Sequence, residues 1–143
     1  INACTTVDEV LEVDLSDGWP SNVCTGGLPH GNPYVLSFDA PGVPTDGMIV
    51  FHHTFRMAVK FPASMSNSEV KADVAATAET DLLIKKNTST TVGTVRFAAA
   101  GTSATFVGFS ASSWAVGDLL TLVAPATADA TLADLHGTLM GVR

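Results

Sequence analysis

Charged residues are scarce in this 143-residue chain, and basic residues are scarcest. Lys and Arg number 7, Asp and Glu 14, and charged residues make up 15% of the sequence, against a usual share of about 25%. The formal net charge of -7 argues against nucleic acid as a partner, because its binding proteins present basic patches. Low charge combined with 46% hydrophobic residues favours apolar surface buried against other copies, so we expect a homo-oligomer.

The sequence has little that resembles a membrane span. Its least charged stretch, residues 92–125, contains only Arg96 and Asp118 as charges. Turn residues such as Gly101 and Ser110 divide that stretch into pieces shorter than the roughly 18 residues that a spanning helix requires. The pieces have the length of strands, so we expect consecutive strands and no membrane insertion.

Cysteine is nearly absent as well. Cys4 and Cys24 are the only two, and a bond between them would close a loop of about 20 residues, worth about 3 kcal/mol. Two thiols do not establish a redox compartment. Neither has a second Cys or His at the short spacing of zinc ligands, so no metal site is expected there.

Helical periodicity is missing, whereas strand patterns recur along the chain. The clearest is "GMIVFHHTFRMAVKFP" (residues 47–62), with apolar side chains at every odd position from Ile49 to Phe61 except His53, and mostly polar ones at the even positions. This alternation predicts one long strand, or two strands that share a bend. Other predicted strands lie in "PYVLSFDA", "SEVKADVAA", "TDLLIKKN", "TVGTVRFAAA", "SATFVGFSA", "DLLTLVAPA" and "ADLHGTLMGVR". We predict an all-β fold, an antiparallel β-sandwich or jelly roll of about eight strands.

The composition predicts an N-terminal arm or linker over residues 1–32 and a β-sandwich domain over residues 33–143. "DEVLEVDL" has the pattern of a short strand, and the Gly- and Pro-rich "SDGWPSNVCTGGLPHGNP" after it argues against regular structure. The arm contains acidic residues and no Lys or Arg, which serves either solubility or docking to a basic partner. Trp19 is either a core residue or an anchor in a neighbouring subunit. The candidate docking residues are Asp8, Glu9, Glu12, Asp14, Leu15 and Trp19.

The histidines do not form a metal site in this pattern. Adjacent residues on a strand point to opposite faces, so His52 and His53 cannot bind one metal ion from regular β-structure. We expect His53 to face the core and His52 to face outward. His30 and His136 are isolated in the sequence and would come together only around a symmetry axis.

No constellation of catalytic residues emerges. "GFSAS" (residues 108–112) lacks the second Gly and the strand-to-helix context of a nucleophile elbow. Asp129 and Asp134 suit caps or turns, with calcium binding as the alternative. Asn87 begins a glycosylation sequon that carries little weight without a secretory context. We therefore predict a protein that is not an enzyme and uses no cofactor or metal.

Residues from about Tyr34 to Arg143 resemble a module at the C-terminal end of tailed-phage and prophage virion proteins. The resemblance rests on residues 42–106 and 114–143, with a basic-aromatic strand, "KKN…VGTVRFAA", a "GD-L-L" strand start and "APATADATLADL…TL-G-R", in that order. It implies a β-rich virion domain, often trimeric, on a fibre, tail tip or capsid surface.

Three functions follow from this resemblance and from the composition. The first is a surface-displayed phage fibre or receptor-binding domain, assembled in the host cytoplasm, that contacts a host glycan or surface protein. The second is a capsid decoration or cement protein that clamps neighbouring capsid subunits and so has other virion proteins as partners. The third is a carbohydrate-binding or adhesin module.

Overall fold

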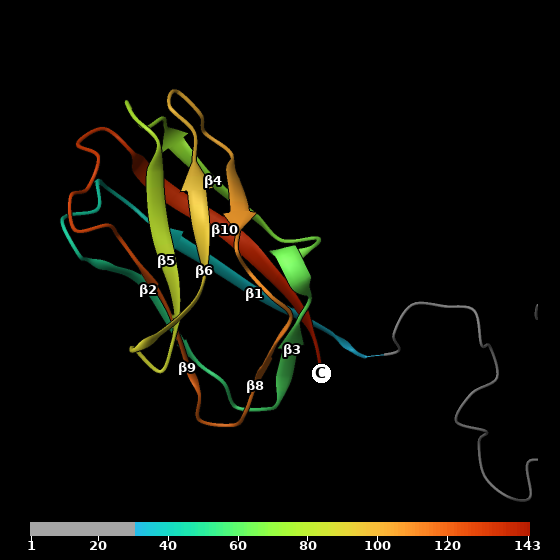
Figure 1. The fold of residues 1–143 in the computed structure, drawn as a ribbon. Coiled ribbons are helices and arrows are strands. Elements are labelled where there is room, and N and C mark those ends of the chain that lie inside the picture. Colours follow the sequence, from blue (N-terminus) through green and yellow to red (C-terminus); the bar gives the residue numbers. More distant parts are fainter. Residues whose placement is uncertain (1–30) are drawn as a thin grey trace, which may run out of the picture. The chain divides into compact units, whose positions relative to one another are not determined.

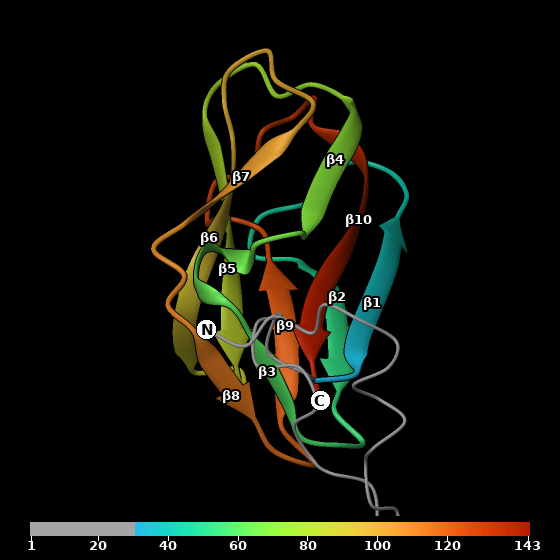
Figure 2. The same ribbon diagram turned by 90° about the vertical axis from the view of Figure 1, so that its right-hand side faces the viewer.

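The computed structural model describes residues 31–143, and Asn32–Arg143 form one compact unit. Ten antiparallel strands make two five-stranded sheets, which Figures 1 and 2 show as two layers. Within the described residues the only helical element is a short 3-10 turn, η3 (Ala63–Met65). The prediction of an all-β antiparallel fold is confirmed, with ten strands rather than about eight. The predicted domain boundary near residue 33 stays a prediction.

The first sheet is organised around its longest strand, β10. Its order is β1-β10-β3-β8, and β4 also pairs with β10. One edge of β10 pairs with β1 from Pro33↔Val142 to Ala40↔Leu135, while its other edge pairs first with β4 and then with β3. The bounds are β1 (Pro33–Ala40), β3 (Val59–Phe61), β4 (Glu69–Val74), β8 (Ser112–Trp114) and β10 (Ala133–Val142).

The second sheet has the order β2-β9-β5-β6-β7. Its β5–β6 hairpin turns at Asn87 and Thr88, both in the left-handed region, as expected for the polar turn of residues 86–90. The bounds are β2 (Ile49–Thr54), β5 (Thr80–Lys86), β6 (Thr90–Phe97), β7 (Ala104–Val107) and β9 (Leu119–Val123).

The segment predicted as one long strand is two strands in different sheets. The chain leaves the second sheet after β2 and joins the first sheet at β3, so the alternative of two strands is the better description. Two of the expected core positions, Ile49 and Met57, are exposed. A register shift between Ile49 and Phe51 turns Ile49 outward, because a bulge reverses the alternation, and Met57 lies in the connection between the strands.

Side chains from both sheets form a single core. An aromatic cluster lies within it: Phe55 packs against Phe61 and Trp114 with ring centroids 6.0 and 5.1 Å away. All three side chains are essentially inaccessible to solvent. Burial of this much aromatic surface is a major contribution to the stability of a domain of this size.

The two sides of the structure are connected differently. On one side a backbone bridge pairs Lys71 with Ser103, which links β4 to the segment before β7. On the other side β1 and β2, each the end strand of its sheet, meet through side chains. Tyr34 Oη lies 2.8 Å from His53 Nε2 on this side. The outer edges of β1 and β2 thus have no strand partner within residues 31–143.

Candidate functional site

A groove of about 300 Å³ crosses the outer face of the first sheet. Its floor is β10, and its walls come from β1 and β4. The strand register places Ser37 opposite Thr138 and Thr138 opposite Glu69, and the next row places His136 opposite Lys71. The polar residues that line the groove are Ser37, Glu69, Lys71, His136 and Thr138.

Gly137 is required by the close approach of the three strands. A Cβ atom at this position would lie 2.6 Å from the carbonyl oxygen of Glu69 and 3.0 Å from the Phe38 ring. The backbone oxygen cannot move without breaking the β4–β10 ladder. Gly137 lies on the core face of β10, opposite the buried Phe38 and Val70, and glycine therefore allows the three strands to approach closely there.

The polar groups of the groove interact with one another and remain accessible. Ser37 Oγ and Thr138 Oγ1 are 3.3 Å apart. Lys71 Nζ lies 2.8 Å from Glu69 Oε1, and both side chains are about half exposed or more. His136 Nδ1 lies 3.2 Å from the carbonyl oxygen of Asp134. The groove thus presents hydroxyl, carboxylate, ammonium and imidazole groups to solvent.

The arrangement offers hydrogen bonds rather than a reacting centre. In the part of the chain that the structure describes, no hydrogen bond joins the His136 ring to the hydroxyl of Ser37 or Thr138. The same part of the chain contains no group of three or more His, Cys, Asp or Glu side chains that could hold a metal ion. Several exposed donors and acceptors on a rigid sheet are suited to a polar ligand.

His52 and His53 point to opposite faces, as predicted. His52 is exposed, whereas His53 packs edge-on against Phe55 with ring centroids 5.0 Å apart and contacts Tyr34. Burial lowers the pKa of His53, because a charged imidazolium is poorly solvated among aromatic rings. His53 is therefore a structural residue.

Asp129 acts as a turn residue, as expected, whereas Asp134 lies inside β10, where its backbone has a φ of 56°. Asp129 accepts hydrogen bonds from Thr77 Oγ1 at 2.6 Å and Thr131 Oγ1 at 2.6 Å, and from backbone N–H groups that include Leu132 at 3.0 Å. These bonds, first those of Thr131 and Thr77, hold the pKa of Asp129 far below its usual range. Asp134 accepts a hydrogen bond from the Gly42 N–H at 2.7 Å.

Asn87, the first residue of the sequon, makes hydrogen bonds within the domain through its side chain. Its Nδ2 donates to Asp118 Oδ1 at 2.9 Å and its Oδ1 accepts from the Leu119 N–H at 2.8 Å. Asp118 also pairs with Lys86 Nζ at 2.8 Å. Bonds to Lys86 and then to Asn87 lower the pKa of Asp118 to about 2. This network closes the β5–β6 hairpin onto the turn before β9.

The remaining predicted positions contribute little to the groove. Residues 108–111 lie between β7 and β8, Ser112 begins β8, and Ser110 is exposed. Cys4, Cys24, His30 and the candidate docking residues of the arm lie outside the described residues. The last group comprises Asp8, Glu9, Glu12, Asp14, Leu15 and Trp19.

Sequence reasoning found only His136 among the groove residues. Ser37, Glu69, Lys71 and Thr138 look like ordinary outward positions of three separate strands. Their alternation with buried residues indicates that these four side chains point outward. Only the pairing of the three strands shows that they lie side by side. The same holds for Gly137.

Comparison of the chain with known protein families, curated proteins and solved structures gives no match. The resemblance to phage virion modules thus stays a prediction. Within residues 31–143, no helix is long and apolar enough to cross a membrane.

Proposed function

We propose that residues 33–143 form a recognition domain of a phage virion that is not an enzyme, displayed on the particle surface, with a host-surface glycan as its ligand. The observation that carries the proposal is the polar groove on the outer face of the first sheet. The virion assignment rests on the sequence resemblance alone. In this proposal the two sheets are the layers of a β-sandwich of the jelly-roll kind, and the functional unit is a homotrimer.

A glycan suits the chemistry of the groove better than an apolar ligand does. Sugar hydroxyl groups both donate and accept hydrogen bonds, and the groove offers acceptors at Glu69, donors at Lys71 and hydroxyls that do both at Ser37 and Thr138. The rigid sheet fixes the backbone of these residues, so binding has to order only their side chains.

The test is binding of purified bacterial surface polysaccharides to the full chain, measured on a glycan array and by calorimetry. Lys71→Met and Glu69→Gln should each weaken binding about tenfold or more, since each removes a hydrogen bond to a charged group. Lys60→Met is the matched control, because Lys60 is exposed on β3 of the same sheet and outside the groove. Equal affinity of all three variants for the polysaccharide would show that the groove does not bind it.

A second candidate function, capsid decoration, is favoured by a different observation. The outer edges of β1 and β2 lack a strand partner within the described residues, and they expose Val35 (55%) and Ile49 (51%). Unprotected strand edges with apolar side chains are sites of association between chains. Such an edge suits contact with another copy or with a capsid subunit.

Copy number separates the two functions. A decoration protein is present in far more copies per particle than a fibre protein, so quantification of the chain in intact virions decides between them. Light scattering tests the oligomer in both cases. A stable monomer of 14.8 kDa at micromolar concentration would contradict the homotrimer.

A further inference from the structure

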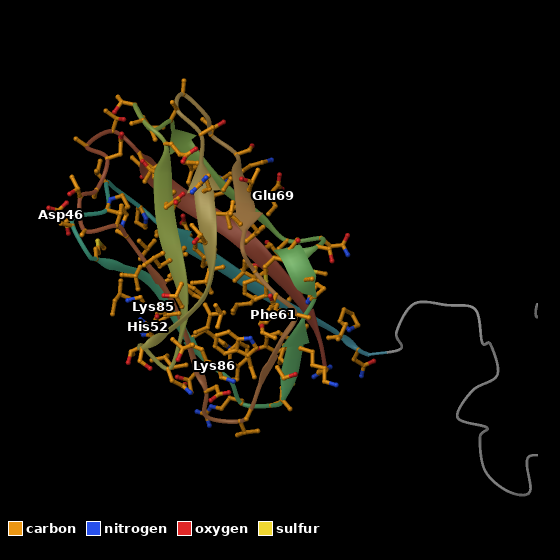
Figure 3. The ribbon with its side chains drawn as sticks, in the orientation of Figure 1. Asp46, His52, Phe61, Glu69, Lys85 and Lys86 are labelled. Atoms are coloured by element: carbon orange, nitrogen blue, oxygen red, sulfur yellow. The ribbon has the colours of Figure 1, made fainter. Side chains whose placement is uncertain are left out.

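One row of polar side chains crosses the outer face of the second sheet, opposite to the groove. His52 on β2 pairs in register with Thr121 on β9, and Thr121 pairs with Lys85 on β5. Side chains that face each other on neighbouring strands have Cβ atoms about 5 Å apart. Figure 3 shows His52 and Lys85 close together at this face. An imidazole and an ammonium group therefore flank the hydroxyl of Thr121.

Thr121 is the unusual member of the row. Its neighbours Leu120 and Leu122 point into the core, so Thr121 points outward, yet it is only 2% exposed. Its Oγ1 is the one buried side-chain polar atom without a hydrogen-bond partner within the described residues. Folded proteins rarely leave a buried hydroxyl unpaired, because its desolvation is then uncompensated.

Lys85 carries a positive charge that no carboxylate neutralises within the described residues. Lys71, Lys86 and Arg96 each lie within 4.0 Å of a carboxylate. Among residues 31–143, Lys85 has no such ion pair. Its half-buried position beside Thr121 leaves a positive group directed at the row.

An aliphatic row runs beside the polar one, two residues away on β9 and β5 and three residues away on β2, where the register shifts. Ile49, Val123 and Leu83 face one another across β2, β9 and β5, and Val107 extends the row on β7 beyond Thr94. Ile49 is 51% and Val107 39% exposed. A ligand that covers both rows needs an anionic end and an apolar body.

We propose that this face of the second sheet binds the carboxylate of an aliphatic ligand. The carboxylate accepts hydrogen bonds from Lys85 Nζ, the Thr121 hydroxyl and the His52 ring, and the hydrocarbon chain lies on Ile49, Val123 and Leu83. The ligand supplies the acceptor that the Thr121 hydroxyl lacks, and its charge is complementary to Lys85. The site is separate from the groove and does not depend on the glycan proposal.

The experiment is titration of the full chain with octanoate, followed by the backbone amide NMR signals of His52, Thr121 and Lys85. We expect saturation with a Kd of about 1 mM or below, and an affinity about tenfold or more above that of acetate, because acetate lacks the apolar body. Octyl sulfate tests whether the site distinguishes a carboxylate from another anion on the same chain. Absence of saturable shifts at the three residues, or equal affinity for acetate and octanoate, overturns the proposal.

Two variants separate a ligand site from a structural defect. Lys85→Gln should abolish the octanoate shifts, whereas Lys60→Gln should leave them unchanged. Thr121→Val removes the unpaired hydroxyl at constant shape, so it should raise the Tm while it weakens octanoate binding about tenfold. Thr105→Val, at an exposed threonine of β7 outside both rows, should change neither. Unchanged octanoate affinity in Thr121→Val, or equal loss in Lys85→Gln and Lys60→Gln, contradicts the site.

Discussion

Tyr34 Oη lies 2.8 Å from His53 Nε2 and so joins β1 of one sheet to β2 of the other. Phe38 and Phe51 stack further along the same two strands, with ring centroids 4.9 Å apart. These contacts connect the sheets on the side where no backbone bridge is present within the described residues. The stability of this side therefore depends on the protonation state of one imidazole.

The first prediction concerns His53 and pH. Burial lowers the pKa of His53 below the ordinary histidine value of 6.5 in the folded protein, so the unfolded chain binds the proton more tightly. The contribution to stability is then complete above about pH 7 and is lost as the pH falls through 6.5. Urea unfolding at a series of pH values should show this decline.

A pair of variants tests the assignment to His53. His53→Gln should flatten the decline between about pH 7 and pH 5, because no group at that position then titrates. The exposed neighbour His52 gives the matched control, and His52→Gln should retain the decline. An identical pH profile for the two variants would show that the decline has another origin.

The second prediction concerns the two faces of the segment after β2. Phe55 is fully buried against Phe61 and Trp114, so Phe55→Asp places an unpaired charge in the core and should cost more than about 4 kcal/mol. Thr54 is exposed on β2, and Thr54→Asp should change the free energy of unfolding by about 0.5 kcal/mol or less. Circular dichroism and urea unfolding measure both; equal damage from the two changes would contradict the assignment of faces.

The third prediction concerns acid. The folded-state pKa of Asp118 is lowered to about 2 and that of Asp129 is lowered further, in each case from 3.8. The stability from these carboxylates is present above about pH 4 and is lost as the pH falls toward 2. Asp129→Asn should lower the Tm at pH 7 and reduce its further fall in acid. Asp73→Asn changes an exposed carboxylate, so this variant should have the same Tm as the unmodified chain at each pH.

The fourth prediction concerns the N-terminal residues. Asn32–Arg143 are one compact unit with a single core, so deletion of residues 1–20 should leave the β domain folded. Its Tm and near-ultraviolet circular dichroism should match those of the full chain. A truncated chain that fails to fold would show that the deleted residues contribute to the core.

The same deletion tests whether the N-terminal residues attach the domain to a particle. Residues 1–32 carry Asp and Glu but no Lys or Arg, so an attachment through them should weaken with salt, because exposed charges are screened over about 10 Å at 0.1 M. We expect the truncated chain to be lost from virions. Normal copy number of the truncated chain would place the attachment in the β domain.

The sequence by itself determined most strands of the described domain, though not β8, and most of their buried faces. Alternation along 90–97 identifies β6, because burial of one face of a sheet requires a period of two, and strand-length segments between turn residues identify β1 (33–40) and β5 (80–86). It also assigned His52 and His53 to opposite sides. Turn chemistry identified the caps at Asp118 and Asp129. These features are local, so a short window of sequence contains the whole signal.

Only the tertiary structure decided which strands are neighbours. The segment 47–62 reads as one strand, yet β2 and β3 enter different sheets, because partners far away in the chain, β9 and β10, pair with them. The groove joins Ser37 to Thr138, 101 residues apart, and the outer row joins His52, Thr121 and Lys85. Alternation shows that a side chain points outward but not what lies beside it, since strand pairing is set by the packing of the whole core.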